Sequence, residues 1–132
     1  MAIYARDAGV WKSVSGGGST VGNANFTDTA TGTYTDGGVD YKYINYTGTG
    51  SVTFDTAGFA DMLLVAGGGA GGAAARGPGG GAGGHLYLTN AYLPAGSLTV
   101  TVGAGGTASN AAYAETRGTD SKLDLYYSVG GG

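Results

Sequence analysis

The stretch Asp61-Met62-Leu63-Leu64-Val65-Ala66 runs directly into the hexapeptide Gly-Gly-Gly-Ala-Gly-Gly at residues 67–72. The same hexapeptide returns unchanged at 79–84, after Ala73-Ala74-Ala75-Arg76-Gly77-Pro78. A continuous apolar run of this length is typical of a strand that is buried on both faces. The sequence therefore predicts a buried strand at 61–66 that leads into a glycine tract, and the nature of this tract decides the fold.

Two interpretations of the tract meet difficulties. The spacing Gly67-x-Gly69-x-x-Gly72 after a strand matches the dinucleotide-binding fingerprint, which requires a helix to begin there and an acidic residue to follow. Pro78 and six further glycines oppose a helix over 73–84, and no acidic residue occurs between Asp61 and Glu115. A disordered spacer suits the composition, but a long structureless loop between two strands is uncommon within a compact domain.

The third interpretation is an ordered, extended glycine helix. The polyproline-II form has three residues per turn and no internal hydrogen bonds, so its backbone groups must bond to neighbouring chains. The two hexapeptides would then form antiparallel rods, with further rods at 103–106 and 130–132. Valine at Gly68 or Gly80 is expected to disrupt the packing, whereas Ala70 and Ala82 occupy the tolerated position of each hexapeptide.

The remaining sequence predicts an all-β protein, a small β-sandwich or meander. Turn signals such as Asp36-Gly37-Gly38 and Thr47-Gly48-Thr49-Gly50 separate short alternating segments. The expected domains are 16–39, a Gly/Thr-rich linker with the first strands, and 40–132, a β-domain that carries the tracts 67–84, 103–106 and 130–132. The expected inward-facing residues are Val52 and Phe54, Leu86 and Leu88, and Leu98, Val100 and Val102. The alternation also places Tyr41, Tyr43 and Asn45 opposite Lys42, Ile44 and Tyr46, and Leu123, Leu125 and Tyr127 on one face of a final strand.

Residues 1–15 are expected to form a separate docking module. Ile3–Arg6 and Val10–Val14 are β-prone and lie on either side of the turn Asp7-Ala8-Gly9, which predicts a hairpin anchored by Trp11. Because a two-stranded hairpin is marginal alone, this one is expected to dock on a partner through the flexible linker Ser15–Ser19. Deletion of residues 1–14 is therefore expected to leave the fold of 40–132 intact.

Composition excludes several classes of protein. The 132 residues include 30 glycines and no cysteine, carry a net charge of −3 and contain six basic residues, which argues against disulfide scaffolds and nucleic-acid binding. The run Met62–Ala66 is far too short to cross a membrane. One histidine and one glutamate leave little for acid–base chemistry, and Asp28, Asp36 and Asp40 lack calcium-loop spacing. We therefore expect no catalytic residue, cofactor or metal site.

Three residues are candidates for contacts at the surface or with partners: Trp11, Arg76 in the connection between the hexapeptides, and His85, the only imidazole. The sequons Asn25-Phe26-Thr27 and Asn45-Tyr46-Thr47 are read as chance matches. Because the large apolar side chains make a thin core for this length, the chain is expected to assemble into a homo-oligomer, trimeric if it is a fibre.

The order of these motifs resembles the glycine-rich domain of bacteriophage tail fibres and tail-tip adhesins. The similarity rests on the strand before Gly67, on Leu93-Pro94-Ala95-Gly96, on the strand Leu98–Val102 with Gly103-Ala104-Gly105-Gly106, and on the ending Ser128–Gly132. Residues 3–14 are similar to a short Trp-containing module of phage virion proteins. The tracts here are shorter than those of a full adhesin tip.

This resemblance implies a non-enzymatic virion protein, located in the virion and displayed on the particle surface. Its implied partners are other virion proteins, further copies of the chain and a host cell-surface receptor, with no nucleic acid and no membrane insertion. Two alternatives stay open: a capsid or tail decoration protein, and a Gly/Thr-rich ice-binding protein, which would need a regular row of threonines.

Overall fold

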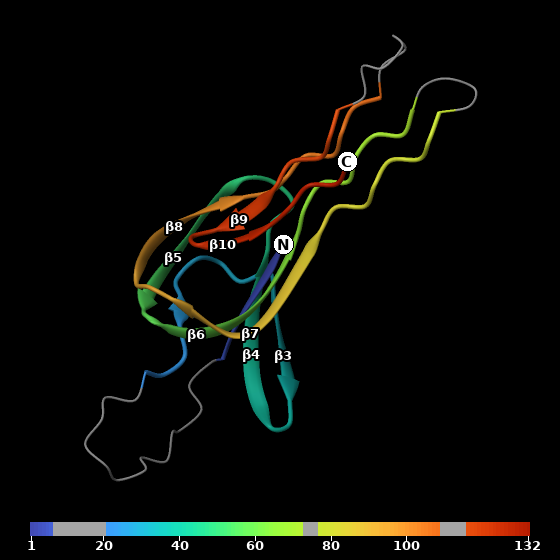
Figure 1. Cartoon of the computed structure of the whole chain (residues 1–132). Coiled ribbons are helices and arrows are strands. Elements are labelled where there is room, and N and C mark those ends of the chain that lie inside the picture. The colour runs from blue at the N-terminus through green and yellow to red at the C-terminus, as the bar shows by residue number, and fades with distance from the viewer. Residues whose placement is uncertain (7–20, 73–76, 109–115) are drawn as a thin grey trace.

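The structure is a computed structural model, and it describes residues 1–6, 21–72, 77–108 and 116–132. Within these ranges it has strands and no helix, and therefore no helix that could cross a membrane (Figure 1). The strands are β1 (Ala2–Arg6), β2 (Asn25–Phe26), β3 (Gly32–Asp36), β4 (Val39–Asn45), β5 (Gly50–Thr56), β6 (Gly58–Val65), β7 (His85–Leu93), β8 (Gly96–Thr101), β9 (Ser121–Leu123) and β10 (Tyr126–Ser128).

Two antiparallel sheets share one core, which confirms the all-β prediction. The first sheet has the strand order β3-β4-β1-β6-β7, and the second has the order β10-β9-β8-β5-β2. The alternating segments place their apolar residues between the sheets, where Phe26 and Phe54 meet edge to face with ring centroids 6.4 Å apart. The buried core consists of Ile3, Ala24, Phe26, Ile44, Val52, Phe54, Ala60, Met62, Leu64, Ala91, Leu93, Val100 and Leu123. Leu86, Leu88, Leu98 and Val102 pack against it, as predicted.

Strand β1 corrects the expected N-terminal hairpin. Residues 2–6 pair with β4 along one edge, and residues 2–4 pair with β6 along the other. Ile3 is fully buried in the core, so this segment is an internal strand of the first sheet and not half of a separate module. The sequence reasoning failed because it paired β1 with the nearest β-prone segment, whereas distant strands supply both of its neighbours. Val10–Val14, Trp11 and the linker Ser15–Ser19 lie outside the described residues.

Strand β6 corrects the prediction of burial on both faces. Gly58, Ala60, Met62 and Leu64 point into the core, while the alternate positions Leu63 and Val65 face outward. Val65 is 48% exposed. An apolar run does not reveal whether both faces are covered, and here the second sheet covers only one face.

Two turns depend on residues with positive φ. Gly37 and Gly38, at φ 56° and 79°, connect β3 to β4, as the Asp-Gly-Gly signal predicts. The expected final strand over Leu123–Tyr127 is instead the hairpin β9–β10, which reverses at Asp124 with φ 52°. Leu123 is consequently buried, whereas Leu125 is 84% exposed at the turn.

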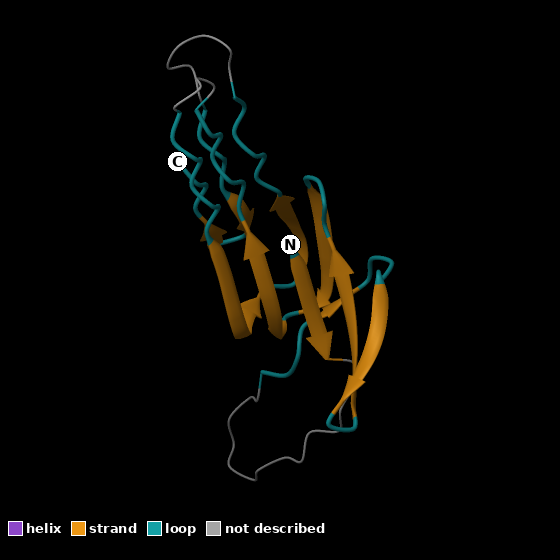
Figure 2. Ribbon diagram, turned by 90° about the vertical axis from the view of Figure 1, so that its right-hand side faces the viewer, coloured by secondary structure: helices purple, strands orange, loops and turns teal. Residues whose placement is uncertain are grey.

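Five extended segments continue the strands at one end of the sheets (Figures 1 and 2). We call them rod 1 (66–72), rod 2 (77–84), rod 3 (102–108), rod 4 (116–120) and rod 5 (129–132). Rod 1 follows β6 and rod 2 leads into β7, both in the first sheet. Rod 3 follows β8, rod 4 leads into β9 and rod 5 follows β10, all in the second sheet. The antiparallel pairing brings all five to the same end of the molecule, because neighbouring strands end and begin side by side.

Candidate functional site

Rod 1 is the centre of the bundle and is hydrogen-bonded to all four other rods. Gly67 N–H donates to Thr119 O of rod 4 at 3.0 Å, and Gly69 N–H donates to Gly81 O of rod 2 at 2.7 Å. In return, rod 1 accepts bonds from Gly106 N–H of rod 3 at 2.7 Å and from Gly131 N–H of rod 5 at 2.8 Å. Only a chain without side chains lets four backbones come this close, which explains the composition.

The hydrogen bonds between the antiparallel rods 1 and 2 recur at every third residue. Ala66, Gly69 and Gly72 of rod 1 donate in turn to Gly84, Gly81 and Pro78 of rod 2. This spacing is one turn of a three-residue helix. It confirms the prediction of two antiparallel glycine rods. The segment after Gly67 is therefore extended and does not open a helix, so the dinucleotide fingerprint lacks the structure that it requires.

Threonine side chains hold rod 4 against rod 3. Thr119 N–H donates to Ala104 O at 2.9 Å, and Thr119 Oγ1 accepts a bond from Ala104 N–H at 2.8 Å. Thr116 repeats this pattern three residues earlier with Thr107, at 3.2 Å and 2.7 Å. Both hydroxyls thus act within the bundle, a role that the sequence analysis missed. A T-x-x-T spacing opposite a glycine tract was the available signal.

Two polar side chains fix the base of the bundle. Ser121, fully buried at the start of β9, donates through Oγ to Val65 O at 2.6 Å and accepts from Gly103 N–H at 2.9 Å. Its neighbour Asp120 accepts from Gly130 N–H through Oδ1 at 2.9 Å. These bonds connect the first sheet and rods 3, 4 and 5 at the point where strands become rods.

The need for glycine differs between positions of the bundle. A Cβ on Gly80 would overlap the carbonyl oxygen of Gly69, as the sequence predicts. A Cβ on Gly68 would lie 3.4 Å from Gly81 O, which is ordinary contact. The expected disruption by valine at Gly68 rested on a Cβ that wedges the rods apart, and this reason is wrong for Gly68, because a Cβ there stays in ordinary contact with the backbone of rod 2. Ala82 is exposed and Ala70 half-buried, which fits the tolerated position of each hexapeptide.

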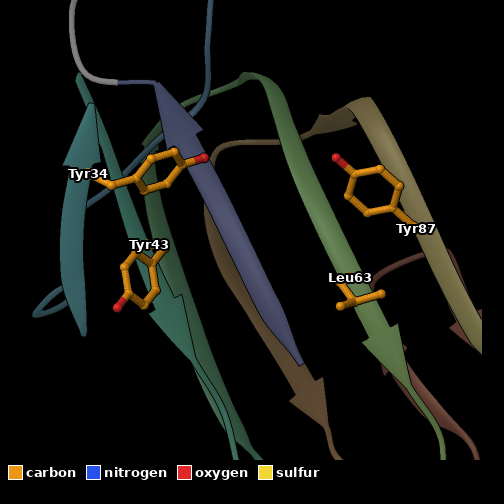
Figure 3. A pocket seen from close by; sticks show the side chains of 4 residues that line it. All are labelled: Tyr34, Tyr43, Leu63 and Tyr87. Carbon is orange, nitrogen blue, oxygen red and sulfur yellow. The ribbon is translucent and has the colours of Figure 1, made fainter. Parts of the chain in front are cut away.

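The outer face of the first sheet carries an aromatic hollow (Figure 3). Tyr34, Tyr43, Leu63 and Tyr87 line this open space of about 570 Å³. Tyr34 also stacks on Tyr41, with ring centroids 4.9 Å apart. Tyr87 is 59% exposed. The sequence analysis missed this surface, because outward tyrosines on half-buried strands have the same pattern as core residues.

Of the predicted contact residues, only His85 lies within the described part of the chain. It begins β7, is exposed and pairs with Val65 of β6. Trp11 and Arg76 lie outside the described residues. The structure does not bring His85 together with another titratable group into a metal-binding cluster, and no such cluster occurs in the described ranges. Asp28 instead accepts from Thr53 N–H at 2.6 Å, and Asp40 accepts from the Thr35 hydroxyl at 2.6 Å.

Comparison with known proteins gives one match. Residues 45–132, which hold β5 to β10 and all five rods, match the family described as a glycine-rich domain. No curated protein and no solved structure matches the chain.

Proposed function

The chain belongs to the glycine-rich domain family, and on the strength of its rod bundle we propose that it is a bacteriophage virion protein of the fibre or adhesin kind. It is displayed on the particle surface, contributes to host attachment and acts without catalysis. The observation that carries this proposal is the five-rod bundle, which extends from one end of a β-domain and consists largely of backbone (Figure 2).

The bundle suits the presentation of short connections. Rods 1 and 2 end at Gly72 and Gly77, and rods 3 and 4 end at Ala108 and Thr116, so two connections leave from the end that lies away from the sheets. Their sequences can vary without altering a rod, because the bonds between rods join backbone atoms and threonine hydroxyls of the rods themselves. Loops on a rigid scaffold are a common way of carrying recognition.

Location in the particle tests this proposal. Cryo-electron microscopy of purified particles, with an antibody against the β-domain, is expected to place the protein at a tail fibre or tail tip. Purified protein is expected to compete with the particles for adsorption to host cells, and a variant with residues 73–76 replaced by glycine and serine is expected to compete less well. Labelling of the capsid shell would support a decoration protein instead, and absence from the particle would reject both.

The ice-binding alternative has less support. Thr116 and Thr119 are exposed, but each hydroxyl oxygen already accepts a hydrogen bond from an amide of rod 3, so neither is fully available to bind ordered water. A measurement of thermal hysteresis separates this function from attachment, because an attachment protein is expected to show none.

A further inference from the structure

The ring of rods around rod 1 is open on one side. Backbone bonds connect rod 2 to rod 5, rod 5 to rod 4, and rod 4 to rod 3. Among the described residues no bond joins rod 3 back to rod 2. Rod 1 is therefore uncovered between rods 2 and 3, where its residues 68–72 are half-buried, and we call the uncovered side of these three rods the glycine face.

Rod 1 carries unused hydrogen-bond donors in a regular series. The N–H groups of Ala66, Gly69 and Gly72 point to rod 2, and those of Gly67 and Ala70 point to rod 4. The N–H groups of Gly68 and Gly71 point in the third direction of the three-residue helix, and neither has an acceptor within the described chain. The rise of ~3.1 Å per residue separates these two donors by about 9 Å along the rod. A partner must therefore offer carbonyl groups at that spacing.

The second observation is the presence of glycine where the protomer itself has room for a side chain. Most rod glycines would overlap or crowd neighbouring backbone if they carried a Cβ. Apart from Gly132, the last residue, the exceptions are Gly68, Gly71, Gly79 and Gly105, where a Cβ would meet no atom closer than 3.4 Å. All four belong to rods 1, 2 and 3, none belongs to rods 4 and 5, and none has a positive φ. Glycine without such a need costs conformational entropy, so its use there points to a backbone that approaches from outside.

We propose that the glycine face binds the glycine face of a second copy of this chain. The face is self-complementary, because within the described residues it carries unbonded N–H groups at Gly68 and Gly71 and unbonded carbonyl groups at Gly69 and Gly72, which are also three residues apart. A two-fold axis sets rod 1 of one copy antiparallel to rod 1 of the other, which is the arrangement that rods 1 and 2 already adopt within the chain. This inference does not depend on the virion proposal.

Sedimentation equilibrium of the full chain tests the proposal. We expect reversible self-association, which the double variant Gly68→Ala/Gly71→Ala weakens by roughly tenfold or more in the dissociation constant, because the added methyl groups keep the two backbones apart. The thermal midpoint of the dilute protomer is expected to stay unchanged. Gly79→Ala provides a second test and is expected to weaken the association as well, since its Cβ would meet no described atom of the protomer within 4 Å. Tyr87→Ala, which alters the aromatic hollow instead, is expected to leave the association intact.

Amide exchange gives a readout at the residues themselves. By NMR, the amides of Gly68 and Gly71 are expected to exchange quickly in dilute solution and slowly in concentrated solution. The proposal is overturned by a monomer at a concentration of hundreds of micromolar, by association that the glycine variants leave unchanged, or by association that Tyr87→Ala abolishes.

Discussion

Ser121 Oγ donates a 2.6 Å hydrogen bond to the carbonyl oxygen of Val65, the last residue of β6. The same oxygen atom accepts a hydrogen bond from the N–H of Gly103 and so also holds the start of rod 3. Since Val65 belongs to the first sheet and Gly103 follows a strand of the second, one buried hydroxyl connects the two sheets at the point where the rods begin.

Ser121→Ala is expected to lower the free energy of unfolding by about 2 kcal/mol or more, because it leaves two backbone groups without a partner. Ser128→Ala is the matched control. Ser128 is buried to a similar degree, yet its hydroxyl has no hydrogen-bond partner among the described residues, so its removal is expected to be neutral or slightly stabilising. Urea denaturation of both variants measures the difference. Equal losses would show that Ser121 does not act through its two bonds.

Neighbouring glycines of rod 2 are expected to respond oppositely to alanine. A Cβ at Gly80 overlaps the carbonyl oxygen of Gly69, whereas a Cβ at Gly79 meets no atom of the described residues within 4 Å. Gly80→Ala is expected to cost about 2 kcal/mol or more, since it separates rods 1 and 2 and leaves backbone groups unbonded. Gly79→Ala is expected to be neutral or to stabilise the protomer by up to about 1 kcal/mol through the unfolded chain. Thermal melts in dilute solution compare the stabilities of the two variants. Equal stabilities would contradict the ordered packing of the rods.

The hydroxyl of Thr119 is expected to stabilise rod 3 through a single amide. In Thr119→Val the side chain keeps its shape, but Ala104 N–H loses its acceptor, and a loss of about 1 kcal/mol is expected. Hydrogen exchange at Ala104 is expected to accelerate. Thr107→Val is the control, because the Thr107 hydroxyl makes no bond to a described residue. Unchanged exchange at Ala104 in Thr119→Val would refute the role of the hydroxyl.

The sequence predicted those features that are set by local pattern. The alternation around Val52 and Phe54 identifies β5, and the repeated hexapeptide identifies two antiparallel rods, because period and side-chain size act within a few residues. The features that it missed depend on distant partners. Nothing near Ile3 shows that β1 lies between β4 and β6, and nothing near Ser121 shows that its hydroxyl reaches Val65. The aromatic hollow was missed for a related reason, since the same apolar residues serve on a covered or an uncovered face.

The internal position of β1 reverses the expected result of an N-terminal deletion. Ile3 is fully buried and its strand has neighbours on both sides. Ile3→Ala is therefore expected to cost about 2–5 kcal/mol through lost apolar contact and a residual cavity. Removal of residues 1–6 is expected to unfold the first sheet rather than leave residues 40–132 intact. Circular dichroism and denaturant titration measure both effects. A folded deletion variant of native stability would show that β4 and β6 do not need the strand between them.

Ionisation of Tyr46 is expected to destabilise the fold at alkaline pH. Desolvation, together with the negative charge of Asp28, raises the pKa of this phenol above its usual value of 10.0. The neutral hydroxyl also donates to Ser51 O at 2.7 Å, a bond that the phenolate cannot make. In the window between the unfolded and the folded pKa, the unfolded chain has already released the proton that the native state retains. The contribution of Tyr46 to stability is therefore fully present below pH 10 and is lost as the pH rises through the folded pKa.

Tyr46→Phe is expected to be less stable than the wild type at pH 8, because it lacks the hydrogen bond, and this difference in stability is expected to narrow above pH 10. Thermal midpoints of both proteins between pH 8 and 11 measure this convergence, and curves that stay parallel would show that another tyrosine accounts for the alkaline loss.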